Sequence, residues 1–347
     1  MDGLSIGKML KNWMEYQDEK CKKYPWIDTL YAIGIMLVIL GHSHPSDWTL
    51  FSGTIFEKVI LFIYTFHMPL FFFISGFLFM NSKSLRKLGY KKWIQNKMIR
   101  LLTPYVFLSV IAIVPKYYLE YHSFVTSEYL AKAIFVPRVG VWGHFWFIPV
   151  LLWCYMLFGI CRSCLFQNES YMVCSLTLIS LIVYFLPIST QWFGISDLRK
   201  ALFYFCIGMG VNHFRLYEKS VKKCTRLIEF AVASIISIIL VNCFYGNQTL
   251  MFCVAMLMIF ACYQIARVIP EQKISLEVSK HNFTIYIYSW LFQAVIMGIC
   301  GKIGMMWEVT SISMFLSGFL GPMFIVWIYR KYLRVHNRFF ELLLGIK

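Results

Sequence analysis

The chain has 347 residues, of which 59% are hydrophobic and 14% charged, and its mean hydropathy is +0.64. Soluble domains carry about 25% charged residues, so this composition excludes an ordinary soluble protein and favours a polytopic membrane protein. The net charge of +16 is also typical of nucleic-acid binding, and the positions of the charges decide between the two interpretations.

The first 26 residues form a mixed-charge segment that includes Glu15, Asp18 and Glu19. The apolar run after it is not followed by a small-residue cleavage site, so we predict no removable signal peptide. We expect residues 1–26 to be a cytoplasmic N-terminal segment.

Ten apolar segments follow, at about 27–43, 58–80, 101–119, 145–161, 171–187, 201–214, 227–244, 249–266, 282–301 and 310–329. A helix that crosses the hydrocarbon core needs about 20 residues, and most segments approach this length. We therefore predict an all-α fold, with a membrane domain of about ten transmembrane helices over 27–330 and a basic cytoplasmic tail over 331–347. The longest outer connection, at about 120–144, is expected to hold a short interfacial helix.

The lysines and arginines are distributed unevenly between the connections. With the N-terminus in the cytoplasm, the inner segments hold 26 of the 33 basic residues and the outer ones hold 7. This asymmetry follows the positive-inside rule and supports an even number of helices with both termini cytoplasmic. The net positive charge therefore reflects membrane topology rather than nucleic-acid binding. We expect membrane lipids, and no nucleic acid, as partners. We also expect the protein to be a multi-pass protein of the cell (inner) membrane.

The 11 cysteines lie mostly within apolar runs, where they act as small hydrophobic residues. Cys161 and Cys164 form a lone C-x-x-C motif, whereas a metal or redox centre would need a second pair or a βαβ context. We expect neither a disulfide framework nor a metal site.

The first apolar segment, within IDTLYAIGIMLVILGHSHP, has polar residues at both ends. Tyr31 and His42 are eleven residues apart, which is three helical turns, so they share a face about 16 Å apart along the axis. Asp28 lies one turn before Tyr31 on nearly the same face. Gly41 and Pro45 are expected to mark the end of the helix.

His42 is predicted at or just inside the outer edge of the membrane. An ionisable side chain at this depth predicts a functional site. The alternative is an interfacial histidine that is hydrogen-bonded to a loop carbonyl. His44, two residues later, is predicted to be an exposed loop residue.

The second apolar segment contributes His67, about nine residues from the outer face and close to the helix-bending Pro69. Histidine suits general-base chemistry because its unperturbed pKa is about 6.5. His67 and His42 would then share an outward-facing polar cavity, although His67 alone also fits a packed, hydrogen-bonded histidine.

The basic connection after this segment, KSLRKLGYKKWIQNKMIRLLTPY, contains Lys97 and Arg100 one helical turn apart. One interpretation is a positive-inside anchor. The other is a binding site for a phosphorylated ligand at the inner mouth of the bundle, because lysine and arginine both bind phosphate.

Five stretches together resemble the integral-membrane acyltransferase-3 family: IDTLYAIGIMLVILGH, FHMPLFFFISGFLF, KMIRLLTPY, HFWFIPVLL and FTIYIYSW. They occur in matching order from residue 27 to about 290. The resemblance implies a ten-helix bundle that O-acylates polysaccharides, lipid-linked glycans or similar acceptors. It also implies an acyl-CoA co-substrate, usually acetyl-CoA, that is presented from the cytoplasmic side, and no tightly bound cofactor.

The same resemblance implies roles for individual residues. His42 matches the histidine of the family signature, and Tyr31 occupies the position of its arginine, so the signature is half met. Asp28 matches a common acidic position, and Trp146 matches the tryptophan of the W-F motif. Arg100 matches the second residue of a basic pair, in which Lys97 replaces the first arginine.

The residues and the resemblance agree on a membrane O-acyltransferase with catalytic His42 and His67. The acyl donor would be bound by Asp28, Tyr31, Lys97, Arg100 and Trp146. His42 would deprotonate the acceptor hydroxyl as it attacks the thioester, and a covalent acyl-histidine is the alternative. Two other classes of function remain open: a transporter or flippase of lipid-linked glycans, and a sensor or assembly scaffold.

Overall fold

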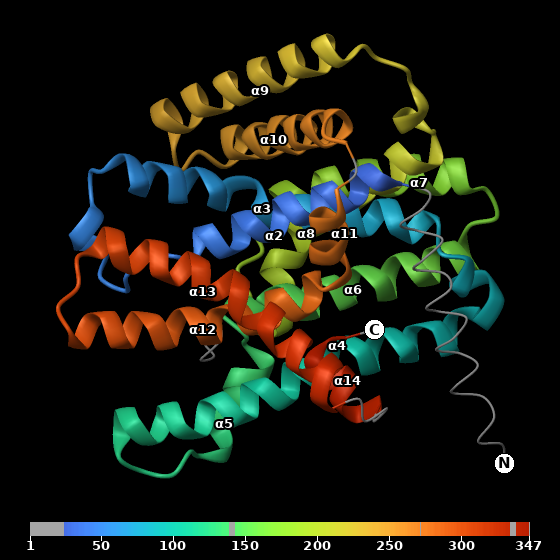
Figure 1. The fold of residues 1–347 in the computed structure, drawn as a ribbon. Coiled ribbons are helices and arrows are strands. Elements are labelled where there is room, and N and C mark those ends of the chain that lie inside the picture. Colours follow the sequence, from blue (N-terminus) through green and yellow to red (C-terminus); the bar gives the residue numbers. More distant parts are fainter. Residues whose placement is uncertain (1–23, 139–142, 271, 334–337, 347) are drawn as a thin grey trace, which may run out of the picture. The chain divides into compact units, whose positions relative to one another are not determined.

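The computed structural model describes residues 24–138, 143–270, 272–333 and 338–346, and within these ranges the fold is all-α (Figure 1). Residues 1–23 of the predicted N-terminal segment, and residues 334–337 and 347 of the predicted tail, lie outside the described ranges. The helices are α2 (Pro25–Gly41), α3 (Ile55–Met80), α4 (Lys83–Tyr121), α5 (Ser127–Phe135), α6 (Phe147–Ile160), α7 (Glu169–Phe185), α8 (Ile195–His213), α9 (Lys223–Phe244), α10 (Gln248–Val268), α11 (Lys273–Lys280), α12 (Asn282–Lys302), α13 (Trp307–Ile328) and α14 (Arg338–Leu344).

Each of the ten predicted apolar segments falls on one of these helices. Among the described residues, six helical stretches are long and apolar enough to cross a membrane: Ile55–Met80, Gly143–Leu165, Lys223–Phe244, Gln248–Val268, Asn282–Lys302 and Trp307–Tyr332. Helices α2 and α7 are shorter apolar helices. The structure therefore supports six of the ten predicted spans by length and composition. Helix α5 confirms the short helix predicted within 120–144.

The chain forms two compact units that interleave along the sequence. Of the described residues, the first unit contains 24–70, 220–270, 272–333 and 346, and the second contains 71–138, 143–219 and 338–345. Helix α3 passes from the first unit to the second at residue 70. Residues 27–330, which were predicted as one membrane domain, thus contribute to both units.

Helix α2 is the central helix of the first unit. It packs against α10, α11, α12 and α13, which is why side chains all around it are buried, Ile27, Leu30, Ile35 and Ile39 among them. Pro25 stands in its first turn, where the missing N–H costs no intrahelical hydrogen bond. The helix ends at Gly41, as the sequence predicts, and the His42 N–H reaches back to the Ile39 carbonyl at 3.2 Å.

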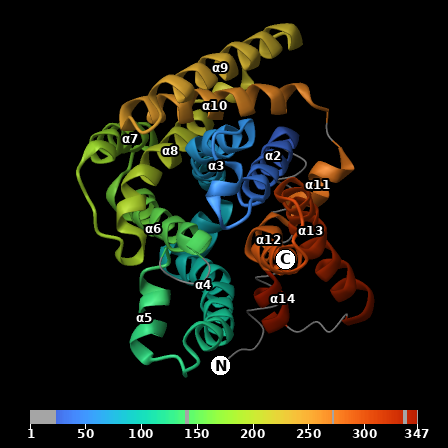
Figure 2. The ribbon, with the colours of Figure 1, turned by 90° about the vertical axis from the view of Figure 1, so that its left-hand side faces the viewer.

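Helices α9 and α10 lie along one another in the same unit (Figure 2). A polar link crosses between them, because Arg226 donates to Gln264 Oε1 at 2.5 Å and the Gln264 amide donates to Glu229. Interhelical hydrogen bonds of this kind stabilise helix pairs in membranes, because the lipid chains offer polar side chains no hydrogen-bond partners.

In the second unit, helix α6 packs against α4 and α8, α7 packs against α8, and α5 and α14 pack against α4. Helix α4 includes the basic connection that follows α3, so this connection is helical. Gly89 interrupts the helical backbone with φ +72°, a left-handed conformation that glycine adopts at little cost. Lys97 and Arg100 lie beyond this break, in the regular part of α4.

Two glycines let α3 and α8 approach until their backbones touch. A Cβ atom placed on Gly76 would lie 1.9 Å from the Phe205 carbonyl oxygen, and one on Gly208 would lie 2.0 Å from the Phe73 carbonyl oxygen. Asn212 adds a hydrogen bond of 2.9 Å from its side-chain amide to the Phe77 carbonyl. Small residues allow such close contact between helices, and they are enriched at interfaces in membranes.

Gly208→Ala is therefore expected to destabilise the protein, because the new methyl group meets a backbone atom that cannot move aside. Overpacking of this kind costs about 1–3 kcal/mol. Gly210→Ala on the same helix is the matched control, since the nearest atom to its added Cβ is Val173 Cγ1 at 3.7 Å. Thermal unfolding of the purified protein in detergent should show a lower midpoint for Gly208→Ala alone. Equal midpoints for the two variants would contradict this account of the α3–α8 contact.

Candidate functional site

His42 follows the last residue of α2 and is half-buried within the first unit. Its ring centroid lies 5.9 Å from that of Tyr64 on α3 and 6.0 Å from that of Trp290 on α12. The next helix along the chain, α3, and the distant helix α12 thus both contribute an aromatic ring beside the candidate catalytic histidine.

Tyr64 connects α3 to the turn that contains His42. Its hydroxyl donates a hydrogen bond of 2.6 Å to the carbonyl of Gly41, and His44 Nε2 lies 3.1 Å from the same hydroxyl oxygen. His44 Nδ1 lies 2.8 Å from the Pro45 carbonyl, which can only accept, so this nitrogen carries the hydrogen. Tyr64 was not identified from the sequence, because a tyrosine in an apolar segment carries no distinguishing signal.

The prediction that His44 is an exposed loop residue is wrong. The residue does lie in the loop after α2, but its side chain is half-buried. Its ring packs against Trp48 and Phe51 at centroid distances of 4.6 and 5.6 Å. The loop folds back over its own aromatic side chains, which are local contacts that the H-S-H-P spacing did not indicate.

His67 is buried on α3, one turn after Ile63. Its Nδ1 lies 2.8 Å from the Ile63 carbonyl, so Nδ1 carries a hydrogen and the neutral ring bears its lone pair on Nε2. The centroids of His67 and Tyr64 are 5.6 Å apart. The structure therefore brings both predicted histidines to the same tyrosine ring.

The other two predicted residues of the first unit lie near the start of α2. Asp28 is 2% exposed, and its Oδ1 accepts a hydrogen bond of 2.5 Å from the Ser279 hydroxyl of α11. Tyr31 is half-buried in the same helix. The Asp28–Ser279 bond ties the start of α2 to α11, which gives this carboxylate a structural role. Its predicted contact with the donor stays a prediction.

Lys97, Arg100 and Trp146 belong to the second unit. The Lys97 ammonium lies 4.5 Å from the ring centroid of Tyr155 and 5.6 Å from that of Trp93. Arg100 is close enough to act electrostatically on the Tyr155 hydroxyl. Lys97 of the predicted basic pair thus lies over the ring of Tyr155 in α6, and the charge of Arg100 acts on the same tyrosine, which the sequence did not single out.

Trp146 ends the short helical turn before α6. The Arg138 guanidinium lies over its ring at 4.5 Å and forms two hydrogen bonds of 2.7 Å with Asp197. One face of this tryptophan is thus covered by a paired arginine, a contact typical of cation–π packing.

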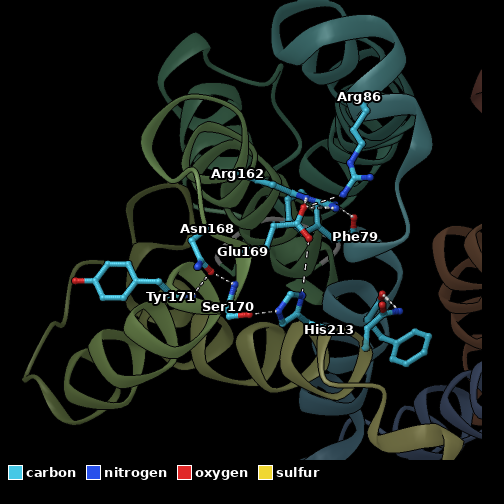
Figure 3. Close-up of polar contacts among 10 residues, drawn as sticks. Phe79, Arg86, Arg162, Asn168, Glu169, Ser170, Tyr171 and His213 are labelled. Atoms are coloured by element: carbon cyan, nitrogen blue, oxygen red, sulfur yellow. Dashed lines mark hydrogen bonds and ion pairs between the residues drawn. The ribbon is translucent and has the colours of Figure 1, made fainter.

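A second polar cluster was not predicted at all (Figure 3). Glu169 Oε1 accepts hydrogen bonds from Arg86 at 2.9 Å and from Arg162 at 2.9 and 3.0 Å. Arg162 also donates to the Phe79 carbonyl at 2.9 Å. We call Arg86, Arg162, Glu169, Ser170 and His213 the Glu169 cluster. It joins the end of α3, the start of α4, the turn after α6, the start of α7 and the end of α8.

The spatial arrangement of Ser170, His213 and Glu169 resembles a hydrolytic triad. Ser170 Oγ lies 2.7 Å from His213 Nε2, but His213 Nδ1 is 3.8 Å from Glu169, too far for a hydrogen bond. Both arginines also bind the carboxylate that would have to orient the histidine. The arrangement therefore holds helix ends together rather than activating the serine.

The comparison with protein families is decisive for the class of activity. The sequence profile of the acyltransferase-3 family, described as an acyltransferase domain, matches residues 24–331. The chain belongs to the acyltransferase-3 family. Comparison with curated proteins and with solved structures finds no significant match.

Membership of the acyltransferase-3 family implies a membrane acyltransferase that acts on an acyl donor and an acceptor. The match spans both compact units, so it includes the histidines around Tyr64 and the basic pair at Tyr155. Within the described residues, no group of three His, Cys, Asp or Glu side chains is arranged to hold a metal ion.

Glu169→Gln is expected to destabilise the second unit, because it removes the charge that pairs with Arg162, whose side chain is 5% exposed. Hydrogen bonds to charged groups contribute about 1.5–3 kcal/mol. Glu218→Gln is the control, since the Arg215–Glu218 pair is exposed at 3.8 Å and should contribute less than about 1 kcal/mol. Thermal unfolding would contradict the role of the Glu169 cluster if both substitutions lowered the midpoint equally.

Burial lowers the pKa of His44 from its ordinary value, against the opposing effect of the hydrogen bond to Pro45. As the pH drops below about 6.5, His44 takes up a proton more readily in the unfolded chain than in the folded one. The free energy of unfolding should therefore fall. The unfolding midpoint should therefore decrease more between about pH 7.5 and pH 5 for the native protein than for His44→Gln. An identical decrease in both would show that His44 does not carry this dependence.

Proposed function

We propose that the protein transfers an acyl group, acetyl in the simplest case, from acyl-CoA to a hydroxyl of a surface polysaccharide or lipid-linked glycan. The observation that carries the proposal is the placement of His42. In a chain of the acyltransferase-3 family, this histidine stands at the end of a buried central helix, against the aromatic rings of Tyr64 and Trp290.

In the proposed reaction, His42 acts as the general base. Its imidazole takes the proton of the acceptor hydroxyl while the oxygen attacks the carbonyl carbon of the thioester. The carbon–sulfur bond then breaks, the new ester leaves, and the imidazolium returns its proton to the CoA thiolate. General acid–base catalysis of this kind contributes about 10²–10⁴-fold to a rate.

His67 is proposed to assist by orienting a reaction partner through Nε2, the nitrogen that bears the lone pair in the neutral ring. Its Nδ1 is committed to the Ile63 carbonyl, which fixes both the tautomer and the rotation of the ring. A histidine held in one orientation suits a positioning role better than a proton shuttle that must turn.

The donor is proposed to bind through the second unit, with Lys97 and Arg100 on the phosphates of CoA. Lysine and arginine bind phosphate strongly, and the Lys97 ammonium lies 4.5 Å from the ring centroid of Tyr155. Asp28, Tyr31 and Trp146 remain proposed donor contacts. Tyr31 stands where the family signature has an arginine, so its contact would be a hydrogen bond rather than an ion pair.

His42→Ala is expected to reduce acyl transfer by at least about 10²-fold, because no other group in the proposal accepts the hydroxyl proton. The assay would follow label from radiolabelled acetyl-CoA into base-labile esters of the glycan fraction, in membranes that contain the full chain. His122→Asn is the matched control, since His122 is exposed at the end of α4 and has φ +49°, which asparagine tolerates.

Undiminished transfer by correctly folded His42→Ala would refute the general-base role. Absence of label transfer by the native protein across a series of acyl-CoA donors would favour the transport of lipid-linked glycans instead. A label that remains on the protein after denaturation, and is lost in His42→Ala, would indicate the covalent acyl-histidine.

A further inference from the structure

Gln293 of α12 holds the last turn of α2 on both sides of His42. Its side chain is 1% exposed, and its amide nitrogen donates hydrogen bonds of 2.9 Å to the Ile39 carbonyl and of 2.9 Å to the Ser43 hydroxyl. The Ser43 hydroxyl in turn donates to the Ile39 carbonyl at 2.6 Å. Both hydrogens of the amide are thereby used on the backbone turn that presents His42.

The Ile39 carbonyl is the point where these contacts converge. It also accepts from the His42 N–H at 3.2 Å, so Gln293, Ser43 and His42 all donate to one oxygen. The last carbonyls of a helix lack partners within the helix, and their position is set by whatever else binds them. Here that position also sets the backbone of His42.

A glycine on α13 makes room for this contact. A Cβ atom on Gly318 would lie 2.9 Å from Gln293 Cγ and 3.0 Å from Ile39 Cγ2. Helices α2, α12 and α13 therefore meet one turn before His42. The absence of a side chain at Gly318 leaves the space that Gln293 and Ile39 occupy there. We call Ile39, Ser43, Gln293 and Gly318 the α2 clamp.

Packing alone does not account for an amide at this place. The Gln293 Oε1 atom is buried and has no hydrogen-bond partner among the described residues. A leucine or methionine would fill a similar volume without leaving a buried acceptor unpaired, which is unfavourable. The amide is therefore explained by its two donated hydrogen bonds, and these act on the residues that flank His42.

We propose that Gln293 is a positioning residue for acyl transfer, which fixes the imidazole of His42 by clamping the turn that carries it. This inference rests on the proposed role of His42. It predicts a loss in the chemical step rather than in donor binding, because the clamp acts on the last turn of α2. The proposed donor contacts Asp28 and Tyr31 lie near the start of that helix, and the proposed phosphate contacts lie in the second unit. Small displacements of a catalytic group reduce rates strongly.

The test compares Gln293→Met with Thr284→Val on the same helix. Methionine keeps the length of glutamine and removes both donated hydrogen bonds. Thr284 is also fully buried and its hydroxyl has no hydrogen-bond partner within the described residues, so valine is a matched substitution outside the clamp. Label transfer from radiolabelled acetyl-CoA to the cell's glycan fraction would be measured over a range of donor concentrations, per amount of folded protein.

Gln293→Met is expected to lower kcat by at least about tenfold, with the KM for acetyl-CoA within about twofold of native. Thr284→Val should keep both constants. Gly318→Ala, which pushes against Gln293 and Ile39, should reproduce the kcat loss, whereas Gly301→Ala should not, because nothing lies within 4 Å of its added Cβ.

An unchanged kcat in Gln293→Met would overturn the inference while leaving the proposed function intact. The positioning role also fails if Thr284→Val loses as much activity as Gln293→Met, since the effect would then be general to α12. If His42→Ala keeps native activity, the proposed general base fails and the positioning role falls with it. If Gln293→Met does not fold, the comparison of Gly318→Ala with Gly301→Ala decides.

Discussion

The carbonyl groups at the end of helix α2 are the constraint on which the candidate site depends. The last carbonyls of a helix have no hydrogen-bond donor within the helix. When the helix end is buried, other parts of the protein must supply these donors. In this protein Gln293 and Ser43 bind the Ile39 carbonyl, and Tyr64 binds the Gly41 carbonyl. Because His42 follows directly, the groups that satisfy the helix end also hold the backbone of this histidine.

The second unit is stabilised by two other kinds of interaction, close helix packing and ion pairing. Backbone contact at Gly76 and Gly208 joins α3 to α8 through dispersion and shape, with no charge involved. The Glu169 cluster joins helix ends through charge instead, and it commits Arg86 and Arg162 to a structural task. Arg162 is held by Glu169 because a nearly buried guanidinium requires a carboxylate partner.

The candidate site could be predicted in part. His42 and His67 were identified because ionisable side chains are rare in apolar segments, and the structure places both at Tyr64. Tyr64 and Tyr155 were missed because the chain has 21 tyrosines, many of them in apolar segments, and Gln293 was missed because its partners Ile39 and Ser43 lie 254 and 250 residues away. The error at His44 has a related origin, since the spacing of polar residues in a loop does not show which aromatic rings the loop will fold over.

The sequence by itself determined the helical class, the positions of the apolar segments, the end of α2 at Gly41 and the resemblance to the acyltransferase-3 family. These depend on local composition and on spacing along one helix, which a single chain displays directly. Only the tertiary structure decided which side chains meet. Gln293 is 250 residues from Ser43 and 254 from Ile39, and nothing local relates their positions. They meet because the carbonyls at a buried helix end need donors, and folding brings α12 to α2 to supply them.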